Sequence, residues 1–299
     1  MFTSERLFAL GQYVLPQHRL SRLMGSITRC RNTVFKDAMI RSFIKLYGVD
    51  MEQALDPDPA AYGCFNEFFT RALKPETRPI APAPDAVICP ADGTVSRIGA
   101  ITEGRIIQAK GKNFSVTDLL GGHAQNAKLF ANGRFATIYL SPRDYHRLHM
   151  PLSGTLREMT HVPGKLFSVN AATTANVSNL FARNERVITL FDTEAGPMAL
   201  VLVGAIFVAS IETVWHGIVT PPTGATLRTW HYPENPPVLS RGQEMGRFNM
   251  GSTVIVLFGD NVVEWEESLT ADSIVCMGQS LGRLTRQTAQ SSDRLQRRG

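Results

Sequence analysis

The feature of this chain that most constrains its fold is a run of short β-branched segments beyond residue 90. Gly, Asn and Asp separate these apolar segments, which is the pattern of strands joined by turns. The predicted strands span residues 94–98, 105–108, 135–140, 186–191, 198–203, 206–212 and 252–258. We therefore expect a β-rich body of mainly antiparallel strands.

Before this region the apolar spacing is helical. Within residues 5–46 apolar side chains recur three or four positions apart, and Pro16 and Gly48 interrupt the pattern. Two or three helices are predicted here, followed by a short Phe-rich helix near 65–71 and a proline-rich linker or arm over 75–84. The predicted fold class is α+β, with N-terminal helices followed by the β-rich body.

Positive charge is concentrated at the two ends of the chain. Residues 1–50 carry a net charge of +5 and residues 282–299 a net charge of +4, whereas the part between them carries −4. A basic, partly amphipathic end binds anionic lipid with about 1 kcal/mol per Lys or Arg near the surface. A solvated helix face explains the same charge equally well. No basic stripe with interleaved aromatic residues is present, so we predict no nucleic-acid partner.

The sequence carries no pattern of a spanning helix or a disulfide framework. The longest uncharged apolar stretch, 195–211, is broken by Gly, Pro and Ser and is shorter than the roughly 18 to 20 residues that a spanning helix needs. No secretory signal is recognised in residues 1–15. The four cysteines are scattered without a CxxC pair. We expect the chain to stay inside the cell, in a reducing compartment.

The segment from Gly246 to Phe258 contains a Gly251-Ser252-Thr253 step at the threshold of a predicted strand. Taken alone, such a step is ordinarily a turn. Glycine, however, can adopt backbone angles closed to other residues and so leave its carbonyl open to attack. The Ser252 hydroxyl can then attack the Gly251 carbonyl carbon. The resulting ester can undergo β-elimination, which leaves a dehydroalanine that hydrolyses to a pyruvoyl cap.

Such a reaction needs a base and a group that orients the base. The segment 141–151 offers His146 and His149, and the segment 90–95 offers Asp92 directly before Gly93. Each of these features alone is more often a packing residue or a turn. The two histidines could also be zinc ligands, but no HExxH pattern and no third ligand at suitable spacing accompany them. We therefore predict no metal site.

Taken together and in this order, these segments resemble phosphatidylserine decarboxylase of the bacterial, membrane-associated type. The resemblance covers most of the chain. It is carried by residues 13–16, 21–25, 65–71, 90–93, 108–111, 141–151, 166–170, 180–186, 211–215, 243–248 and 251–253. Two features depart from the family: Met250 stands where Leu is common, and the Arg-rich tail after Leu281 is not part of the family pattern.

The resemblance implies a role for each candidate site residue. Cleavage falls between Gly251 and Ser252, and Asp92, His149 and Ser252 form the self-processing triad. Ser252 becomes the pyruvoyl Schiff-base group, which is a covalent cofactor. His146 is the candidate proton donor for the decarboxylation. A β chain, 1–251, and an α chain, 252–299, remain together as a heterodimer, with further oligomerisation left open.

The resemblance also implies the domains and the activity. A helical, basic membrane-docking region is expected over 1–75, a β-rich catalytic domain over 76–281 and a basic flexible tail over 282–299. The expected reaction is pyruvoyl-dependent decarboxylation of phosphatidylserine to phosphatidylethanolamine and CO2. The residues that hold the lipid phosphate are not identified by the sequence. The expected location is the cytoplasmic side of the cell membrane, where the protein binds the anionic surface peripherally.

Three other functions fit parts of the sequence. A serine hydrolase would use an intact Ser252, but the chain lacks the GxSxG elbow. A non-catalytic membrane scaffold would have no use for Asp92, His149, Gly251 and Ser252 together. A pyruvoyl enzyme acting on a soluble amino acid would have no obvious use for basic, amphipathic ends.

Overall fold

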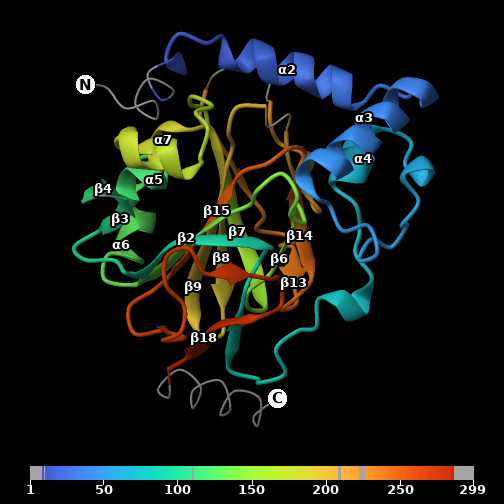
Figure 1. Ribbon diagram of the computed structural model, residues 1–299. Coiled ribbons are helices and arrows are strands. Elements are labelled where there is room, and N and C mark those ends of the chain that lie inside the picture. Colours follow the sequence, from blue (N-terminus) through green and yellow to red (C-terminus); the bar gives the residue numbers. More distant parts are fainter. Residues whose placement is uncertain (1–8, 10, 110, 208–209, 222–225, 286–299) are drawn as a thin grey trace.

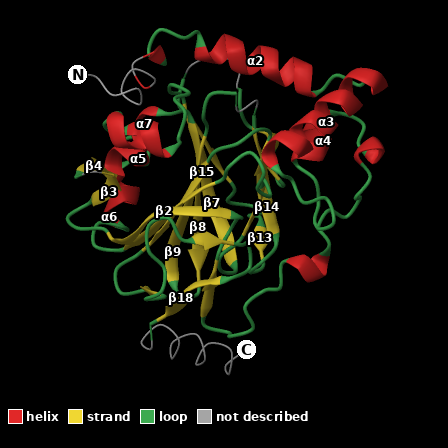
Figure 2. Cartoon of the chain, viewed as in Figure 1, coloured by secondary structure: helices red, strands yellow, loops and turns green. Residues whose placement is uncertain are grey.

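The computed structural model describes residues 9, 11–109, 111–207, 210–221 and 226–285 (Figure 1). Residues 1–8 and 286–299 lie outside this range, and with them most of the predicted basic tail. In Figure 2 helices lie at the top, the upper right and the left of the view, around strands that fill the centre. The helices are α2 (Gln17–Thr28), α3 (Thr33–Tyr47), α4 (Phe65–Phe69), α5 (Val116–Leu119), α6 (Ala124–Lys128), α7 (Ala171–Asn176) and α8 (Leu180–Arg183), with 3-10 turns η1 (Pro59–Ala61) and η2 (Pro75–Thr77).

The N-terminal helices begin and end where the local chemistry dictates. Pro16 directly precedes α2. Proline has no N–H group, and the first N–H groups of a helix have no intrahelical partner, so proline costs nothing at this position. The Asn32 side chain caps α3 by accepting a hydrogen bond of 3.0 Å from the Phe35 amide. Gly48 ends α3 in the left-handed region with φ of 64°. Two helices of the predicted helical region are therefore confirmed, whereas the expected helical stretch near its start lies largely outside the described residues.

One large antiparallel sheet forms the body of the protein. Its strands follow the order β12-β7-β8-β9-β15-β5-β2-β17, and β13 also pairs with β7. Their bounds are β2 (Gly93–Ala100), β5 (Arg134–Tyr139), β7 (Gly154–Val162), β8 (Arg186–Thr193), β9 (Gly196–Val203), β12 (Arg228–His231), β13 (Val238–Leu239), β15 (Thr253–Phe258) and β17 (Ile274–Val275). The antiparallel pairing confirms the predicted α+β class.

Smaller sheets complete the fold. One has the order β11-β10-β14-β6, another β1-β18-β16, and β3 pairs with β4. Their bounds are β1 (Ala86–Ile88), β3 (Arg105–Ala109), β4 (Lys112–Ser115), β6 (Arg147–His149), β10 (Ile211–Thr213), β11 (Gly217–Ile218), β14 (Glu244–Phe248), β16 (Val263–Trp265) and β18 (Ser280–Leu284).

One predicted strand, 206–212, differs from the structure. Ile206 and Phe207 form a turn, and β10 starts only at Ile211. The backbone of Phe207 has φ of 69°, and a strand cannot continue through that region. Ile206 is half-buried and Phe207 is exposed, so the apolar composition of this stretch does not mark a buried strand.

Strand β15 lies at the centre of the large sheet and is buried on both faces. Val254, Val256 and Phe258 face a core shared with the smaller sheets. Ile255 and Leu257 face a second core shared with the short helices α5 and α8. Because both faces are covered, every side chain of the strand is apolar or fully buried, and the sequence shows a continuous run instead of alternation.

A third cluster attaches the N-terminal helices to this body. Ile40 and Phe43 of α3 pack against Phe65, Phe68 and Phe69 of α4. The short helix α4 thus connects the long helix α3 to the strands.

Replacing Phe68 with Ala should destabilise the protein by about 3–5 kcal/mol, because the side chain is fully buried and leaves a cavity. The free energy of unfolding can be measured by urea denaturation followed by circular dichroism. A matched Val34→Ala change on the exposed side of α3, where the side chain is 80% exposed, should alter it by less than about 0.5 kcal/mol. Equal effects of the two changes would contradict the packing described here.

Candidate active site

The candidate residues meet at one end of the large sheet. Strands β15 and β2 flank β5 on opposite sides, and Tyr139 at the end of β5 lies between Thr253 and Thr94. Ser252 and Asp92 precede these two strands, so both come to the same end of the sheet. The segment 141–151 leaves β5 at this point, with the Leu140 amide donating to the Ser252 carbonyl at 2.9 Å. Three segments far apart in sequence are thereby brought together.

Gly93 permits this close approach. A Cβ atom at this position would lie 2.2 Å from the Tyr139 carbonyl oxygen, so no other residue fits without moving the strand. The dipeptide Asp92-Gly93 is therefore more than a turn, since the glycine lets β2 pair closely with β5. This contact fixes the backbone directly after Asp92.

Ser252 is fully buried, and its hydroxyl has no hydrogen-bond partner among the described residues. A buried hydroxyl without a partner costs free energy, so the arrangement points to a reactive group. Unusual backbone lies one residue earlier than the sequence suggested. Met250 has φ of 105°, which costs of order 1–3 kcal/mol, whereas Gly251 does not adopt a positive φ. The strain sits beside the predicted cleavage site.

His146 is the imidazole placed next to Gly251. Its Nδ1 donates to the Asp144 carbonyl oxygen at 2.8 Å, which leaves Nε2 without a proton. That Nε2 has no hydrogen-bond partner in the described part of the chain, and it lies 3.9 Å from the position that a Cβ on Gly251 would take. Complete burial, together with the charge of Arg71, lowers the pKa of His146 to about 3. The ring is therefore neutral at pH 7, with a lone pair facing the Gly251-Ser252 step.

His149 has a partner on each ring nitrogen. Nδ1 donates to the Gly242 carbonyl oxygen at 2.8 Å, and Nε2 accepts from the Tyr145 hydroxyl at 2.9 Å. Burial lowers the pKa of His149 and raises that of Tyr145, so both groups are neutral. Tyr145 was missed by the sequence reasoning, although it lies inside the segment 141–151, four residues before His149.

Asp92 is held by Arg78 and by the backbone. The Arg78 guanidinium forms a two-pronged ion pair with both carboxylate oxygens, and the Met277 amide donates to Oδ1 at 2.8 Å. Hence Asp92, His149 and Ser252 lie at one end of the sheet, but their side chains each have other partners or none. Arg78 lies in the proline-rich arm, where no pattern in the sequence marked it.

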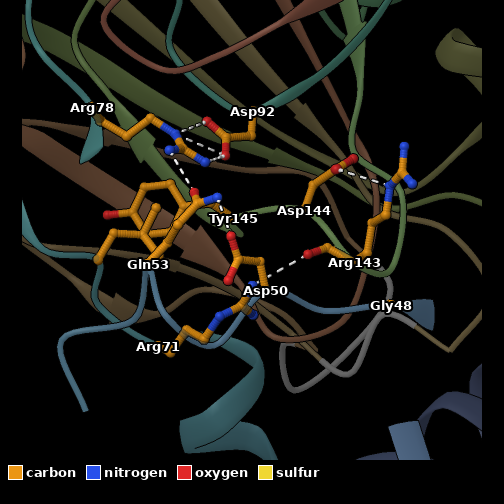
Figure 3. A pocket seen from close by; sticks show the side chains of 10 residues that line it. Gly48, Asp50, Gln53, Arg71, Arg78, Asp92, Arg143, Asp144 and Tyr145 are labelled. Carbon is orange, nitrogen blue, oxygen red and sulfur yellow. Dashed lines mark hydrogen bonds and ion pairs between the residues drawn. The ribbon is translucent and has the colours of Figure 1, made fainter. Parts of the chain in front are cut away.

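A charged pocket of about 230 Å³ adjoins this site. Arg78 and Asp92 face each other on one side of it, and Arg143 and Asp144 lie on another (Figure 3). Tyr145 and Arg71 complete the polar wall. Within the described residues, no group of three His, Cys, Asp or Glu side chains is arranged to hold a metal ion.

A buried hydroxyl at Ser252, a neutral His146 ring beside it and an adjoining charged pocket are typical of an enzyme. The chain belongs to the phosphatidylserine decarboxylase family. The family profile described as phosphatidylserine decarboxylase matches residues 65–283, and a second profile, described as PSD, matches residues 7–48.

Curated relatives are similar over nearly their whole length. A phosphatidylserine decarboxylase proenzyme from Pseudomonas putida is 60% identical over 279 residues, which cover 92% of this chain and 97% of that protein. Proteins of the same name from Azotobacter vinelandii and Bordetella pertussis are 57% and 58% identical, and the aligned regions cover 98% and 94% of them. The resemblance found in the sequence is therefore confirmed.

The buried, neutral state of His146 predicts a pH dependence of stability. Its pKa is depressed in the folded chain, so the unfolded chain binds the extra proton between pH 6.5 and about 3. The contribution of neutral His146 to the free energy of unfolding is present above pH 6.5 and is lost as the pH falls. At pH 5 the loss is about 2 kcal/mol.

The measurement compares urea unfolding at pH 7 and pH 5 for Ser252→Ala and for Ser252→Ala with His146→Gln, so that neither protein can be cut. Between pH 7 and pH 5 the free energy of unfolding should fall by about 2 kcal/mol less in the protein with His146→Gln than in the protein that keeps His146. An equal loss in both proteins would show that His146 is not held neutral by burial.

Proposed function

We propose that this chain cuts its own backbone between Gly251 and Ser252 and then decarboxylates phosphatidylserine to phosphatidylethanolamine and CO2. One observation carries the proposal. Among the residues that the structure describes, the fully buried Ser252 hydroxyl and the His146 Nε2 both lack hydrogen-bond partners, and both lie at the Gly251-Ser252 step. Membership of a family whose relatives are named proenzymes supports a cut chain. A hydrolase with an intact Ser252 is not favoured.

In the proposed cleavage the Ser252 oxygen attacks the Gly251 carbonyl carbon. The peptide C–N bond breaks as the ester C–O bond forms, and the amine of residue 252 takes the proton. β-Elimination then removes the Cα proton of residue 252 to a base, breaks the Cβ–O bond and releases the Gly251 carboxylate. The dehydroalanine that remains takes up water, loses ammonia and becomes the pyruvoyl group. The strained backbone at Met250 favours this cut, since cleavage relieves the strain.

We assign the base in this step to His149, oriented by Asp92, as the family resemblance implies. In this role His149 gives up its hydrogen bond with Tyr145, and Asp92 gives up its ion pair with Arg78. His146 remains the candidate proton donor for the decarboxylation. Because burial keeps its ring neutral, it can donate only after it takes a proton on Nε2, the nitrogen that faces Gly251.

The surroundings of residue 252 fit a pyruvoyl group. The position is enclosed, and His146 Nε2 is an unused polar atom beside it. When formed, the group supplies a ketone that reacts with the substrate amine and accepts the electron pair left as CO2 departs. The protein contributes a water-poor environment and a polar partner at this end of the sheet.

Strand pairing and a hydrogen bond hold the two proposed fragments, 1–251 and 252–299, together. Strand β15 of the small fragment pairs with β5 and β9 of the large fragment along its whole length. Asp92 of the large fragment also accepts from the Met277 amide of the small one. A heterodimer of α and β chains is the expected product.

We also propose that the N-terminal helices bind the anionic cytoplasmic surface of the cell membrane peripherally. Leu23 in α2 and Val34 and Leu46 in α3 expose apolar side chains, and Arg19 and Arg22 lie on the exposed surface of α2. Such a mixture of apolar and basic residues suits the headgroup region of a bilayer. None of the described helices has the length and hydropathy needed to cross a bilayer.

Intact-mass measurement tests the self-cleavage. The wild-type protein should separate into two fragments. The small fragment should lack a free amino terminus and should form one phenylhydrazone when it is treated with phenylhydrazine. Ser252→Ala should remain a single 33.0 kDa chain and lose decarboxylase activity. Ser240→Ala, at an exposed serine, should process normally. An uncut wild-type chain with a free serine would refute the proposal.

Vesicle sedimentation tests the membrane contact. Arg19→Gln with Arg22→Gln should weaken binding to vesicles of phosphatidylserine and phosphatidylcholine by about 30-fold at low salt, since each basic residue contributes about 1 kcal/mol. The matched pair Arg105→Gln with Lys128→Gln removes the same charge from an exposed surface elsewhere. If both pairs weaken binding equally, the helices have no special role.

A further inference from the structure

Arg71 is a buried cation that has no partner of opposite charge. Its side chain is only 5% exposed, and within the described residues it forms no ion pair. One terminal nitrogen donates to the Arg143 carbonyl oxygen at 3.2 Å, and the guanidinium lies 5.5 Å from the centre of the Phe68 ring. The Nε atom is buried and has no hydrogen-bond partner.

An unpaired buried guanidinium is expensive, because burial removes water without replacing it by an anion. Burial accordingly lowers the pKa of Arg71. The nearby carboxylates do not compensate it directly. Asp92 is engaged by Arg78, and Asp144 accepts from the Ser141 amide at 2.6 Å. Arg71 thus retains the capacity to bind an external anion.

The position of Arg71 makes such an anion relevant to the proposed reaction. Arg71 lines the charged pocket and directly follows α4 and Thr70 in the chain. The centre of the Phe69 ring, in α4, lies 4.1 Å from the centre of the His146 ring. Asp144 and Tyr145, which precede His146, line the same pocket. In Figure 3 Arg71 reaches into the pocket on the side opposite the Arg78–Asp92 pair. A headgroup reacting near His146 can therefore extend toward Arg71.

The phosphatidylserine headgroup has two anionic groups, and the chemistry favours the phosphate at this arginine. The carboxylate leaves as CO2 and loses its charge on the way. An arginine bound to the carboxylate would stabilise the substrate more than the transition state and would slow the reaction. The phosphate keeps its charge throughout, so binding it costs nothing in rate.

We propose that Arg71, with Arg143 at the rim of the pocket, binds the phosphate of the phosphatidylserine headgroup. The inference rests on the proposed function, because it takes this lipid as the substrate. The other acidic residue of the pocket, Asp50, does not oppose it strongly. Its two oxygens accept from the Glu52 amide and from the Gln53 side chain, at 3.0 and 2.7 Å.

Kinetics of an Arg71→Met variant, which keeps an unbranched apolar stem but removes the guanidinium, test the assignment. KM for phosphatidylserine in mixed micelles should rise by about 10- to 100-fold, the loss typical of a charge-assisted hydrogen bond in a buried site, with a much smaller change in kcat. The KM of Arg71→Lys should fall between that of the wild type and that of Arg71→Met. Arg105→Gln, on the β3–β4 hairpin away from the pocket, should behave as the wild type.

Binding of the product headgroup distinguishes phosphate from carboxylate and does not depend on turnover. Glycerophosphoethanolamine carries the phosphate but no carboxylate. Its dissociation constant, measured by calorimetry on the full chain, should rise in Arg71→Met by the same factor as KM. If KM rises while this constant is unchanged, Arg71 holds the carboxylate and the proposal is wrong; an unchanged KM overturns it as well.

A competition measurement on the wild-type protein covers the case in which the variants do not fold. Dimethyl phosphate, an anionic diester without an amine, should displace glycerophosphoethanolamine, whereas acetate at the same concentration should not. Displacement by acetate alone, or by neither anion, would overturn the proposal. Mass measurement of the same samples reports the cut at Ser252 separately, so failure of self-processing is not mistaken for failure of phosphate binding.

Discussion

The structure depends on the burial of β15 between β5 and β9. Its side chains contribute to two hydrophobic cores at once, so the strand cannot shift by one residue without exchanging every side chain between them. This constraint fixes the position of Ser252 at the start of the strand. It would also hold the segment beyond the proposed cleavage site in the sheet after a cut, because the pairing does not pass through the Gly251-Ser252 bond.

Burial also sets the chemistry at this end of the sheet. It removes water from Ser252, His146 and His149, keeps both imidazoles neutral and leaves two polar atoms without partners. Their desolvation has a free-energy cost that the surrounding sheet covers through its apolar contacts. The ionic contact between Arg78 and Asp92 lies at the boundary of this region, where it can hold a carboxylate near the site without placing a free charge inside it.

The helical region and the reactive end of the sheet are connected through α4. Its phenylalanines pack on α3 on one side, and Phe69 lies against His146 on the other. Arg71 follows directly and faces the pocket. The element that would rest near the membrane is thus in contact with the residues proposed to bind the lipid headgroup, and the path between them is short and apolar.

The sequence alone determined the fold class, N-terminal helices and most central strands, because their signals are local: Pro16 and Gly48 interrupt the helical spacing, and β15 is a continuous apolar run. It also singled out Gly251-Ser252, Asp92 and the two histidines, and the family resemblance placed them in one site. Only the tertiary structure decided which groups touch. The partners of His149 and Asp92, the strain at Met250 and the unpaired charge of Arg71 arise from contacts between distant segments. Local spacing carries no record of such contacts, since they form only when the sheets and α4 pack together.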